Sequence, residues 1–355
     1  MTDEIDIPAS ASEPKPWWTV RPNEQQRKEI LSFILATGKP YLWQGQTYNK
    51  PPDDAVVDYL DEFRLPKSKL LVPCPCCRPR HPKYRHGMIA WFPNECVIRI
   101  IGHDCFKTIN SERHTEALRK YHADRQRTAD IAYLLDNLDK VPDLIAAVER
   151  AIPIADAVDK FRNDTCATFA EVLRTELWEH IRTGELRVAR NRREFFQSPD
   201  QGEGEREVQI IETYGTIAGQ NFLNRRSKKL GVKLDHAALA LKQINFGSQY
   251  KERVPDMSDA ERFQTARLLR NGMTTVDEVF AAIHELRQFT SAVTLATLNG
   301  WARTEGCPVR MHVEFERGNL YVGLTDHEFR PITAPPAYFD ALPPVPSLAH
   351  KTAAA

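Results

Sequence analysis

Five of the seven cysteines in this 355-residue chain lie between Cys74 and Cys105, together with three of its eleven histidines. Within this stretch, Cys74 and Cys77 form a Cys-x-x-Cys pair. Two thiolates at this spacing can bind one ion from a tight turn, and sulfur and imidazole are the donors that structural zinc prefers. The segment therefore predicts a zinc ion that stabilises a small local fold.

Two apolar runs follow the cysteine pair, at residues 88–92 and 97–101, and Pro93-Asn94-Glu95 separates them. Turn residues between two apolar runs are typical of a β-hairpin. The residues that precede the first strand and those that follow the second meet at the same end of such a hairpin. We therefore predict that one ion is bound by residues at that end: Cys74, Cys77, His103 and Cys105.

Three further residues of the stretch bear on the choice of ligands. His86 directly precedes the first predicted strand, at the same end as His103, and is an alternative fourth ligand. Cys76 could bind the ion only if the turn were rearranged. Cys96 lies beside the hairpin turn, roughly 20 Å from His103 at ~3.3 Å per residue. Metal–ligand bonds of about 2.0–2.3 Å cannot span that distance, so Cys96 is not expected to be a ligand.

The order of a cysteine turn, a hairpin and a ligand before a helix-like stretch resembles the treble-clef class of zinc modules, over residues 72–110. This resemblance implies a structural zinc ion. The second ligand pair reads His-x-Cys here, at His103 and Cys105, where that class has Cys-x-x-Cys. A thioredoxin-like redox dithiol would need a βαβ setting, which the pattern lacks. A deaminase-like catalytic zinc would need an earlier His-x-Glu, and no histidine precedes His81.

The formal net charge is zero, with 48 basic and 48 acidic residues, but the basic residues cluster. Residues 64–86 contain seven Lys and Arg and no acidic residue. A rigid metal turn that presents basic side chains is a common way to bind phosphates, although a solvated surface without a ligand is an equal alternative. Two later clusters, at 187–193 and 225–233, are more typical of solvated surface. The predicted nucleic-acid-binding residues are Arg78, Arg80, Lys83 and Arg85.

Periodicity and composition predict a mostly helical, multi-domain α+β protein with a small zinc-stabilised hairpin module. Helices are expected at 22–36 and 53–63, and the polar, glycine-containing segment 198–207 predicts a linker. The predicted segments are, in order, a disordered 1–16, an N-terminal helical region 17–70, the zinc module 71–110, a helical bundle 111–197, the linker 198–207, a C-terminal α+β domain 208–340 and a tail 341–355.

The C-terminal domain is expected to contain helices followed by a hairpin. A capping box at Ser258 and Glu261 predicts a helix that stops at Gly272, and another capping box begins at Thr275. Alternating apolar residues at 309–315 and 320–324 predict the hairpin. Three helices and a hairpin match the element order of a winged helix. Because the helix from Ser291 carries few basic or amide side chains, a plain α+β domain is the favoured prediction.

Composition narrows the possible functions. No apolar run is long enough to span a membrane, the N-terminus lacks the apolar core of a secretory signal, and free cysteines suit a reducing cytoplasm. The common phosphate-loop, hydrolase and metalloprotease motifs are absent, so an enzyme is not favoured, although an unrecognised carboxylate site is an open alternative.

We predict a zinc protein that binds DNA or RNA, or that serves in a complex acting on nucleic acid. The alternative is a protein–protein adaptor whose zinc module is the interaction platform.

Overall fold

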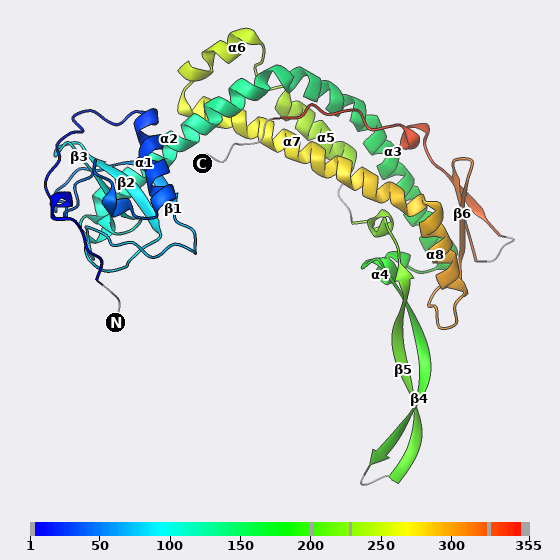
Figure 1. Cartoon of the computed structure of the whole chain (residues 1–355). Helices are drawn as coiled ribbons and strands as arrows, with labels where there is room; N and C mark the ends of the chain where they lie inside the picture. The colour runs from blue at the N-terminus through cyan, green and yellow to red at the C-terminus, as the bar shows by residue number, and fades with distance from the viewer. Residues whose placement is uncertain (1–3, 199–201, 227–228, 325–327, 349–355) are drawn as a thin grey trace. The chain divides into compact units, whose positions relative to one another are not determined.

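The computed structural model describes residues 4–198, 202–226, 229–324 and 328–348. The chain divides into two compact units, the first ending at Ala129 and the second beginning at Asp130 (Figure 1). About 49% of the residues are helical and 19% lie in strands, which confirms the predicted α+β, mostly helical fold class. None of the described helices is both long and apolar enough to cross a membrane.

The first unit is built around an antiparallel sheet in the order β1–β2–β3. Strands β2 and β3 pair from Phe92 opposite Val97 to Gly87 opposite Gly102, which confirms the predicted hairpin. Their apolar runs are largely buried and form the central part of the core of this unit, to which α1, β1 and the start of α2 also contribute. The elements of the unit are α1 (Glu24–Thr37), β1 (Asp58–Arg64), β2 (His86–Phe92), β3 (Val97–Gly102), the start of α2 (Ser111–Asn137), and short 3-10 helices at Ala9–Ala11, Pro40–Leu42 and Phe106–Thr108.

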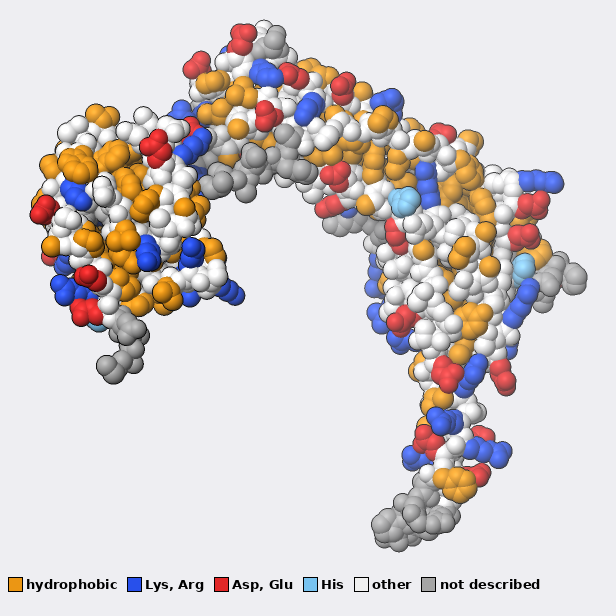
Figure 2. Space-filling model, in the orientation of Figure 1, with side chains coloured by type: hydrophobic (Ala, Val, Ile, Leu, Met, Phe, Trp, Pro, Cys, Tyr) orange, Lys and Arg blue, Asp and Glu red, His pale blue; other side chains and the backbone are white. Residues whose placement is uncertain are grey.

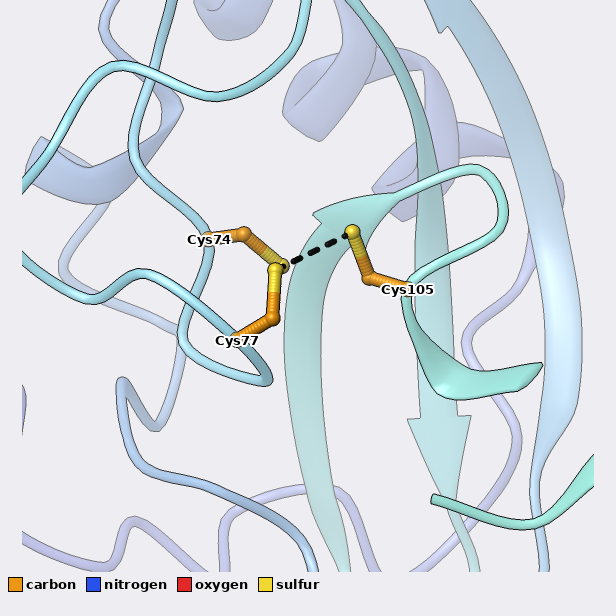
Figure 3. Close-up of side chains that lie close together, drawn as sticks. All are labelled: Cys74, Cys77 and Cys105. Atoms are coloured by element: carbon orange, nitrogen blue, oxygen red, sulfur yellow. Dashed lines mark hydrogen bonds between the residues drawn. The ribbon is translucent and has the colours of Figure 1, made fainter. Parts of the chain in front are cut away.

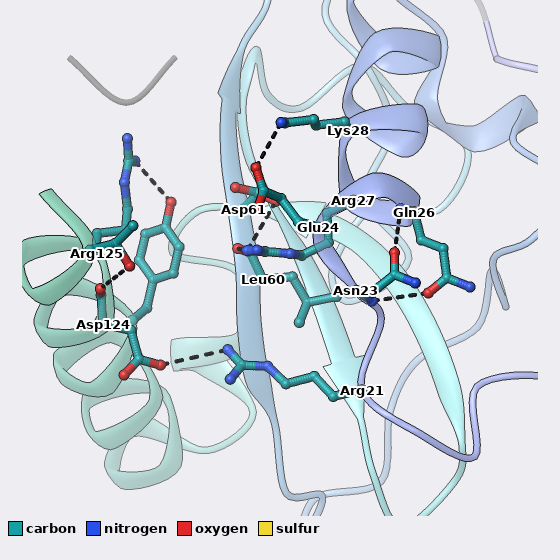
Figure 4. Close-up of polar contacts among 12 residues, drawn as sticks. Arg21, Asn23, Glu24, Gln26, Arg27, Lys28, Leu60, Asp61, Asp124 and Arg125 are labelled. Atoms are coloured by element: carbon teal, nitrogen blue, oxygen red, sulfur yellow. Dashed lines mark hydrogen bonds and ion pairs between the residues drawn. The ribbon is translucent and has the colours of Figure 1, made fainter. Parts of the chain in front are cut away.

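Helix α1 lies close to the predicted range 22–36 and is attached to the sheet by polar contacts (Figure 4). It begins at a capping box, in which the Asn23 side chain accepts from the Gln26 amide and the Gln26 side chain accepts from the Asn23 amide. Arg27 donates to the Leu60 carbonyl at 3.2 Å and lies 3.6 Å from the Asp61 carboxylate, and both partners belong to β1. The first edge of the sheet is thus covered by a helix.

Strand β1 corrects the prediction of a helix at 53–63. The pairing of β1 with β2 shifts between Tyr59 and Asp61, so Leu60 is an extra residue in a bulge. Tyr59 and Leu60 are consequently both buried, where a regular strand would bury only one of two neighbours. The bulge therefore gives the apolar residues a spacing that resembles that of a helix.

The N-terminal residues 4–16, which were predicted to be disordered, pack on the first unit. The Ile5 amide donates to the Arg80 carbonyl at 2.8 Å, and the Lys15 amide donates to the Thr47 hydroxyl at 2.9 Å. Ala11 is buried. Backbone hydrogen bonds order this segment. The prediction of disorder rested on its polar composition, which does not reveal such bonds. Residues 1–3 lie outside the described part of the chain.

The second unit contains the remaining helices and strands around one core. Its regular elements are α3 (Val141–Leu173), α4 (Leu177–Ile181), β4 (Glu185–Ser198), β5 (Gly202–Thr216), α5 (Leu230–Leu241), α6 (Ser248–Arg253), α7 (Asp259–Arg287), α8 (Ala292–Arg303), β6 (His312–Glu316), β7 (Asn319–Gly323) and β8 (Arg330–Thr333). Its 3-10 helices are Leu138–Lys140, Gln220–Leu223, Val254–Asp256, Gln288–Thr290 and Pro336–Phe339.

A single apolar core joins the predicted helical bundle to the predicted C-terminal domain. It includes Val148 and Phe161 of α3, Leu269 of α7, Trp301 of α8 and Leu320 of β7. The division of this region into 111–197 and 208–340 was therefore wrong. Helix α3 is apolar on more than one side and packs against α5 and α7, so its core cannot close without the later helices.

The predicted linker 198–207 is also corrected, because most of it belongs to a long two-stranded ribbon (Figure 1). Strands β4 and β5 pair from Glu185 opposite Thr216 to Ser198 opposite Gly202, and residues 199–201 lie outside the described part of the chain. Most described side chains towards the far end of this ribbon are exposed, so no apolar alternation marks the strands. A polar, glycine-containing composition thus indicates lack of burial and does not exclude strand pairing.

The C-terminal elements confirm one prediction and correct another. The predicted hairpin is β6–β7, and β8 adds a third strand to it. Helix α7 passes through Gly272, where a stop was predicted. A Cβ atom at Gly272 would lie 2.7 Å from the Leu241 side chain, so this glycine permits close packing of α5 on α7. Residues 341–348 of the predicted tail contain no helix or strand.

Candidate metal centre

Three of the predicted ligands come together in the first unit (Figure 3). The sulfur atoms of Cys74, Cys77 and Cys105 all lie within 4.8 Å of one another, and the Cys77 and Cys105 sulfurs are 3.5 Å apart. Thiolates bound to one tetrahedral zinc ion at about 2.3 Å lie about 3.8 Å from one another. The three cysteines are free thiols. Their spacing and donor type therefore fit a metal centre.

The backbone fixes each of the three sulfurs. Cys74 opens a tight turn, in which its carbonyl accepts from the Cys77 amide at 3.3 Å and from the Arg78 amide at 3.0 Å. The Gly102 amide, at the end of β3, donates to the Cys74 sulfur at 3.4 Å. Cys105 returns towards this turn because its amide donates to the Gly102 carbonyl at 2.9 Å. A Cβ atom at Gly102 would lie 2.6 Å from the Cys105 sulfur, so a glycine is needed there.

The surroundings keep these thiols uncharged when no cation is bound. Burial raises the pKa of the Cys77 thiol, and a hydrogen bond with Cys74, together with burial, raises the pKa of Cys105. The pKa of Cys74 is lowered by its hydrogen bond with Cys105, but its contact with Cys76 and its burial outweigh this and raise it. Metal binding at such a centre must displace protons, and the cation then supplies the charge that stabilises the thiolates.

The fourth predicted ligand, His103, belongs to a different cluster. It groups with Glu62 and with His86, the alternative fourth ligand, rather than with the three sulfurs. The Cys105 sulfur lies beside Gly102, the last residue of β3, whereas the backbone of His103, the next residue, pairs with that of His86. The sequence reasoning did not separate the two clusters because it considered only which end of the hairpin each residue occupies.

Two other cysteines of the segment differ in their positions. Cys76 is buried, and its thiol contacts that of Cys74. It is therefore a fourth sulfur beside the three-cysteine centre. Cys96 lies at the other end of the hairpin, where its amide donates to the Pro93 carbonyl at 3.2 Å. Its position agrees with the geometric argument that separated it from the predicted ligands.

The predicted nucleic-acid-binding residues surround the cysteine turn, and we refer to Arg78, Arg80, Lys83 and Arg85 as the basic knuckle. The first three side chains are exposed. Arg85 is half-buried, and its Nε donates to the Lys69 carbonyl at 3.0 Å. Lys83 is close enough to the centre to lower the pKa of both Cys77 and Cys105, although other influences outweigh it. Lys83 therefore lies beside the candidate metal centre.

The loop that carries the basic knuckle is held on both sides by backbone hydrogen bonds. Val72 and Tyr84 exchange amide–carbonyl bonds of 2.9 and 3.1 Å across its base. The Tyr48 hydroxyl donates to the Pro79 carbonyl at 3.0 Å near its tip. These contacts hold the backbone of the loop, so little backbone entropy would be lost when its side chains bind a ligand.

Comparison with known proteins gives no relative from which a role could be transferred: no protein family, no curated protein and no solved structure matches the chain. The interpretation of the site therefore rests on its geometry and chemistry.

Proposed function

We propose that this chain is a structural-zinc protein that binds nucleic acid through the basic knuckle, alone or within a complex that acts on nucleic acid. The ion would be held by Cys74, Cys77 and Cys105, because three thiolates at this spacing suit zinc. The free thiols would persist in a reducing compartment, and we place the protein in the cytoplasm.

One observation supports this proposal above the others. Among the described residues, Arg80 is the one member of the basic knuckle with an ion pair, to Glu4 at 3.3 Å, and both side chains of that pair are largely exposed. An exposed pair of this kind is weak and is readily exchanged for a phosphate. Clustered cations on a fixed loop, with few acidic neighbours, create the positive potential that attracts a nucleic-acid backbone.

The adaptor function remains a second candidate because of one specific feature. Leu70, close to the cysteine turn in sequence, is 83% exposed, and its neighbour Leu71 is also exposed. Exposed apolar side chains beside a rigid metal centre are suited to a protein partner. Apolar association depends little on salt, whereas phosphate binding weakens steeply as salt rises.

Salt dependence therefore separates the two functions. The full-length, zinc-loaded protein would be titrated into labelled duplex DNA and single-stranded RNA at several salt concentrations, with binding measured by fluorescence anisotropy. The proposal predicts binding at low salt and a linear fall of log K with log salt. Each phosphate contact contributes about 0.9 to the slope for duplex DNA and about 0.7 for single strands. Absence of binding to both at low salt would contradict the proposal and favour the adaptor.

A further inference from the structure

The second cluster of the first unit, Glu62, His86 and His103, has no part in the proposed function. The sheet register explains how these residues meet. The His103 amide donates to the His86 carbonyl at 3.1 Å, so the two histidines lie opposite each other at the end of β2 and β3. Glu62 pairs with Met88, two residues from His86 along β2. Residues two apart on a strand share a face, so all three side chains lie on one face of the sheet.

The distances suit a single metal ion. One ligand atom from each of the three residues lies within 4.8 Å of the other two. Nitrogen and oxygen ligands of a first-row ion, at bond lengths of about 2.0–2.2 Å, lie roughly 3–3.5 Å apart, and small side-chain rotations bring atoms within this limit to such separations. The His86 and His103 rings are stacked, with centroids 4.3 Å apart and planes 22° from parallel. The Glu62 carboxylate hydrogen-bonds His86 Nε2.

Neighbouring groups orient these side chains as they do around known metal sites. His103 Nδ1 lies 3.1 Å from the Asp104 carboxylate, which leaves Nε2 available as the ligand atom. Metal-binding histidines commonly contact a carboxylate through their other nitrogen in this way. On the opposite side, Arg125 Nη1 lies 3.9 Å from the Glu62 carboxylate. The three side chains retain 28%, 31% and 20% exposure for Glu62, His86 and His103, so an ion can enter and keep water ligands.

We propose that Glu62, His86 and His103 bind a second divalent first-row metal ion, separate from the cysteine centre. Two imidazoles and one carboxylate suit zinc, cobalt or nickel, whereas the three thiolates of the other centre select softer coordination. The competing explanation is ordinary packing, in which Glu62 and His86 form a hydrogen bond and His103 stacks on it. The two explanations differ in metal stoichiometry, and this inference does not depend on nucleic-acid binding.

The test compares metal content in matched variants. Full-length protein would be equilibrated with excess zinc, freed of unbound metal and analysed by mass spectrometry of the metal. Wild type is expected to hold about two zinc ions per chain, and the H86A/H103A variant about one, because the cysteine centre is unchanged. His81→Ala is the matched control, since His81 is an exposed histidine of the same segment and should leave both ions bound.

Two further measurements make the result decisive. Glu62→Gln keeps a hydrogen-bonding partner for His86 but removes the charge, so it should lose the second ion without unfolding the sheet. If H86A/H103A also loses the cysteine-bound ion, the metal content of the Glu62→Gln variant decides whether the second site exists. Cobalt added to protein whose cysteine centre holds zinc should give visible bands without sulfur-to-cobalt charge transfer. One zinc ion per wild-type chain, or two in the Glu62→Gln variant, would overturn the proposal.

Discussion

The basic knuckle and the β4–β5 ribbon are both rich in arginine, but they differ in how their charges are paired. Along the described part of the ribbon, basic and acidic side chains lie next to one another (Figure 2), and arginines pair with glutamates across or along the strands. These pairs are Arg187–Glu185, Arg190–Glu212, Arg193–Glu205 and Arg206–Glu194, with separations of 2.9 to 3.8 Å. In the described residues around the knuckle, Arg80–Glu4 is the one such pair among its four members. The pairing of charges, more than the number of arginines, should therefore decide where phosphate binds.

The two regions also differ in what fixes them. The knuckle loop is held by the cysteine turn and by hydrogen bonds to Val72 and Tyr48. The far part of the ribbon depends on its own ladder, and Phe195 there is largely exposed. An isolated two-stranded ribbon is only marginally stable in water. A fixed cationic loop is the better phosphate site, since less entropy is lost on binding.

The largest expected effect comes from removing the metal that fixes the knuckle. Replacing Cys74, Cys77 or Cys105 by serine, or adding a chelator, should release the ion and unfold residues 70–110. Structural zinc contributes an apparent 10–16 kcal/mol or so, as much as the whole stability of a typical domain. Limited proteolysis would show early cleavage within 70–110. Cys96→Ser is the control and should keep the metal and the protection.

The second unit provides the contrast within the same experiment. Its core shares no predicted ligand with the cysteine centre and should stay protected when the metal is gone. Cleavage that begins in residues 255–325 as early as in 70–110 would show that the two units do not fold independently.

The next effect is on binding. Neutralising the knuckle in R78Q/R80Q/K83Q removes three cations and should lower the salt slope for duplex DNA by about 2.7, at about 0.9 per contact. The ribbon variant R187Q/R190Q/R193Q removes three arginines that are paired with glutamates and should leave the slope unchanged. Anisotropy titrations of both variants measure the difference. Equal losses in the two variants would mean that charge pairing does not decide the binding site.

A smaller effect should follow when the ribbon is made to resemble the knuckle. E205Q/E212Q removes the partners of Arg193 and Arg190, so the freed arginines should add up to about 1.8 to the salt slope. These side chains are exposed, and such pairs contribute about 0–1 kcal/mol each, so the ribbon should remain folded. Circular dichroism checks the fold. An unchanged slope would show that a ribbon held only by its own ladder does not bind phosphate through its arginines even when they are free.

The smallest effect concerns the one ion pair of the knuckle. Glu4→Gln frees Arg80 and should raise the salt slope by no more than about 0.9, with a stability change below about 1 kcal/mol. Thermal unfolding and the anisotropy assay measure both quantities. A weaker affinity in this variant would indicate that Glu4 orders Arg80 for binding instead of competing with the phosphate.

The sequence predicted those strands whose apolar residues either alternate with polar ones or form an unbroken run between turn residues. The β2–β3 hairpin and the β6–β7 hairpin alternate or run apolar between clear turns, and both are confirmed. The approach of Cys74, Cys77 and Cys105 followed from the Cys-x-x-Cys spacing and from the hairpin, because the residues that flank the hairpin must meet. In each case a local pattern and one pairing rule were sufficient.

The remaining features depend on pairing that leaves no local pattern. Because of the bulge at Leu60, the apolar residues of β1 have a helix-like spacing, and the polar far end of the ribbon has the composition of a linker. Glu62 was missed because its place beside His86 follows from the β1–β2 register, which the sequence alone does not give. The predicted fourth zinc ligand, His103, groups with Glu62 and His86 and not with the three sulfurs, and the hairpin pattern alone does not separate these two groups.

The central claim is that a metal-held knuckle binds nucleic acid, and one measurement tests it most directly. The affinity of the full-length protein for labelled DNA and RNA at low salt would be determined as purified, after chelation, and after zinc is returned. The account predicts salt-sensitive binding that is lost with the metal and restored with zinc. Affinity that is unchanged by metal removal, or absent from the zinc-loaded protein, would contradict it.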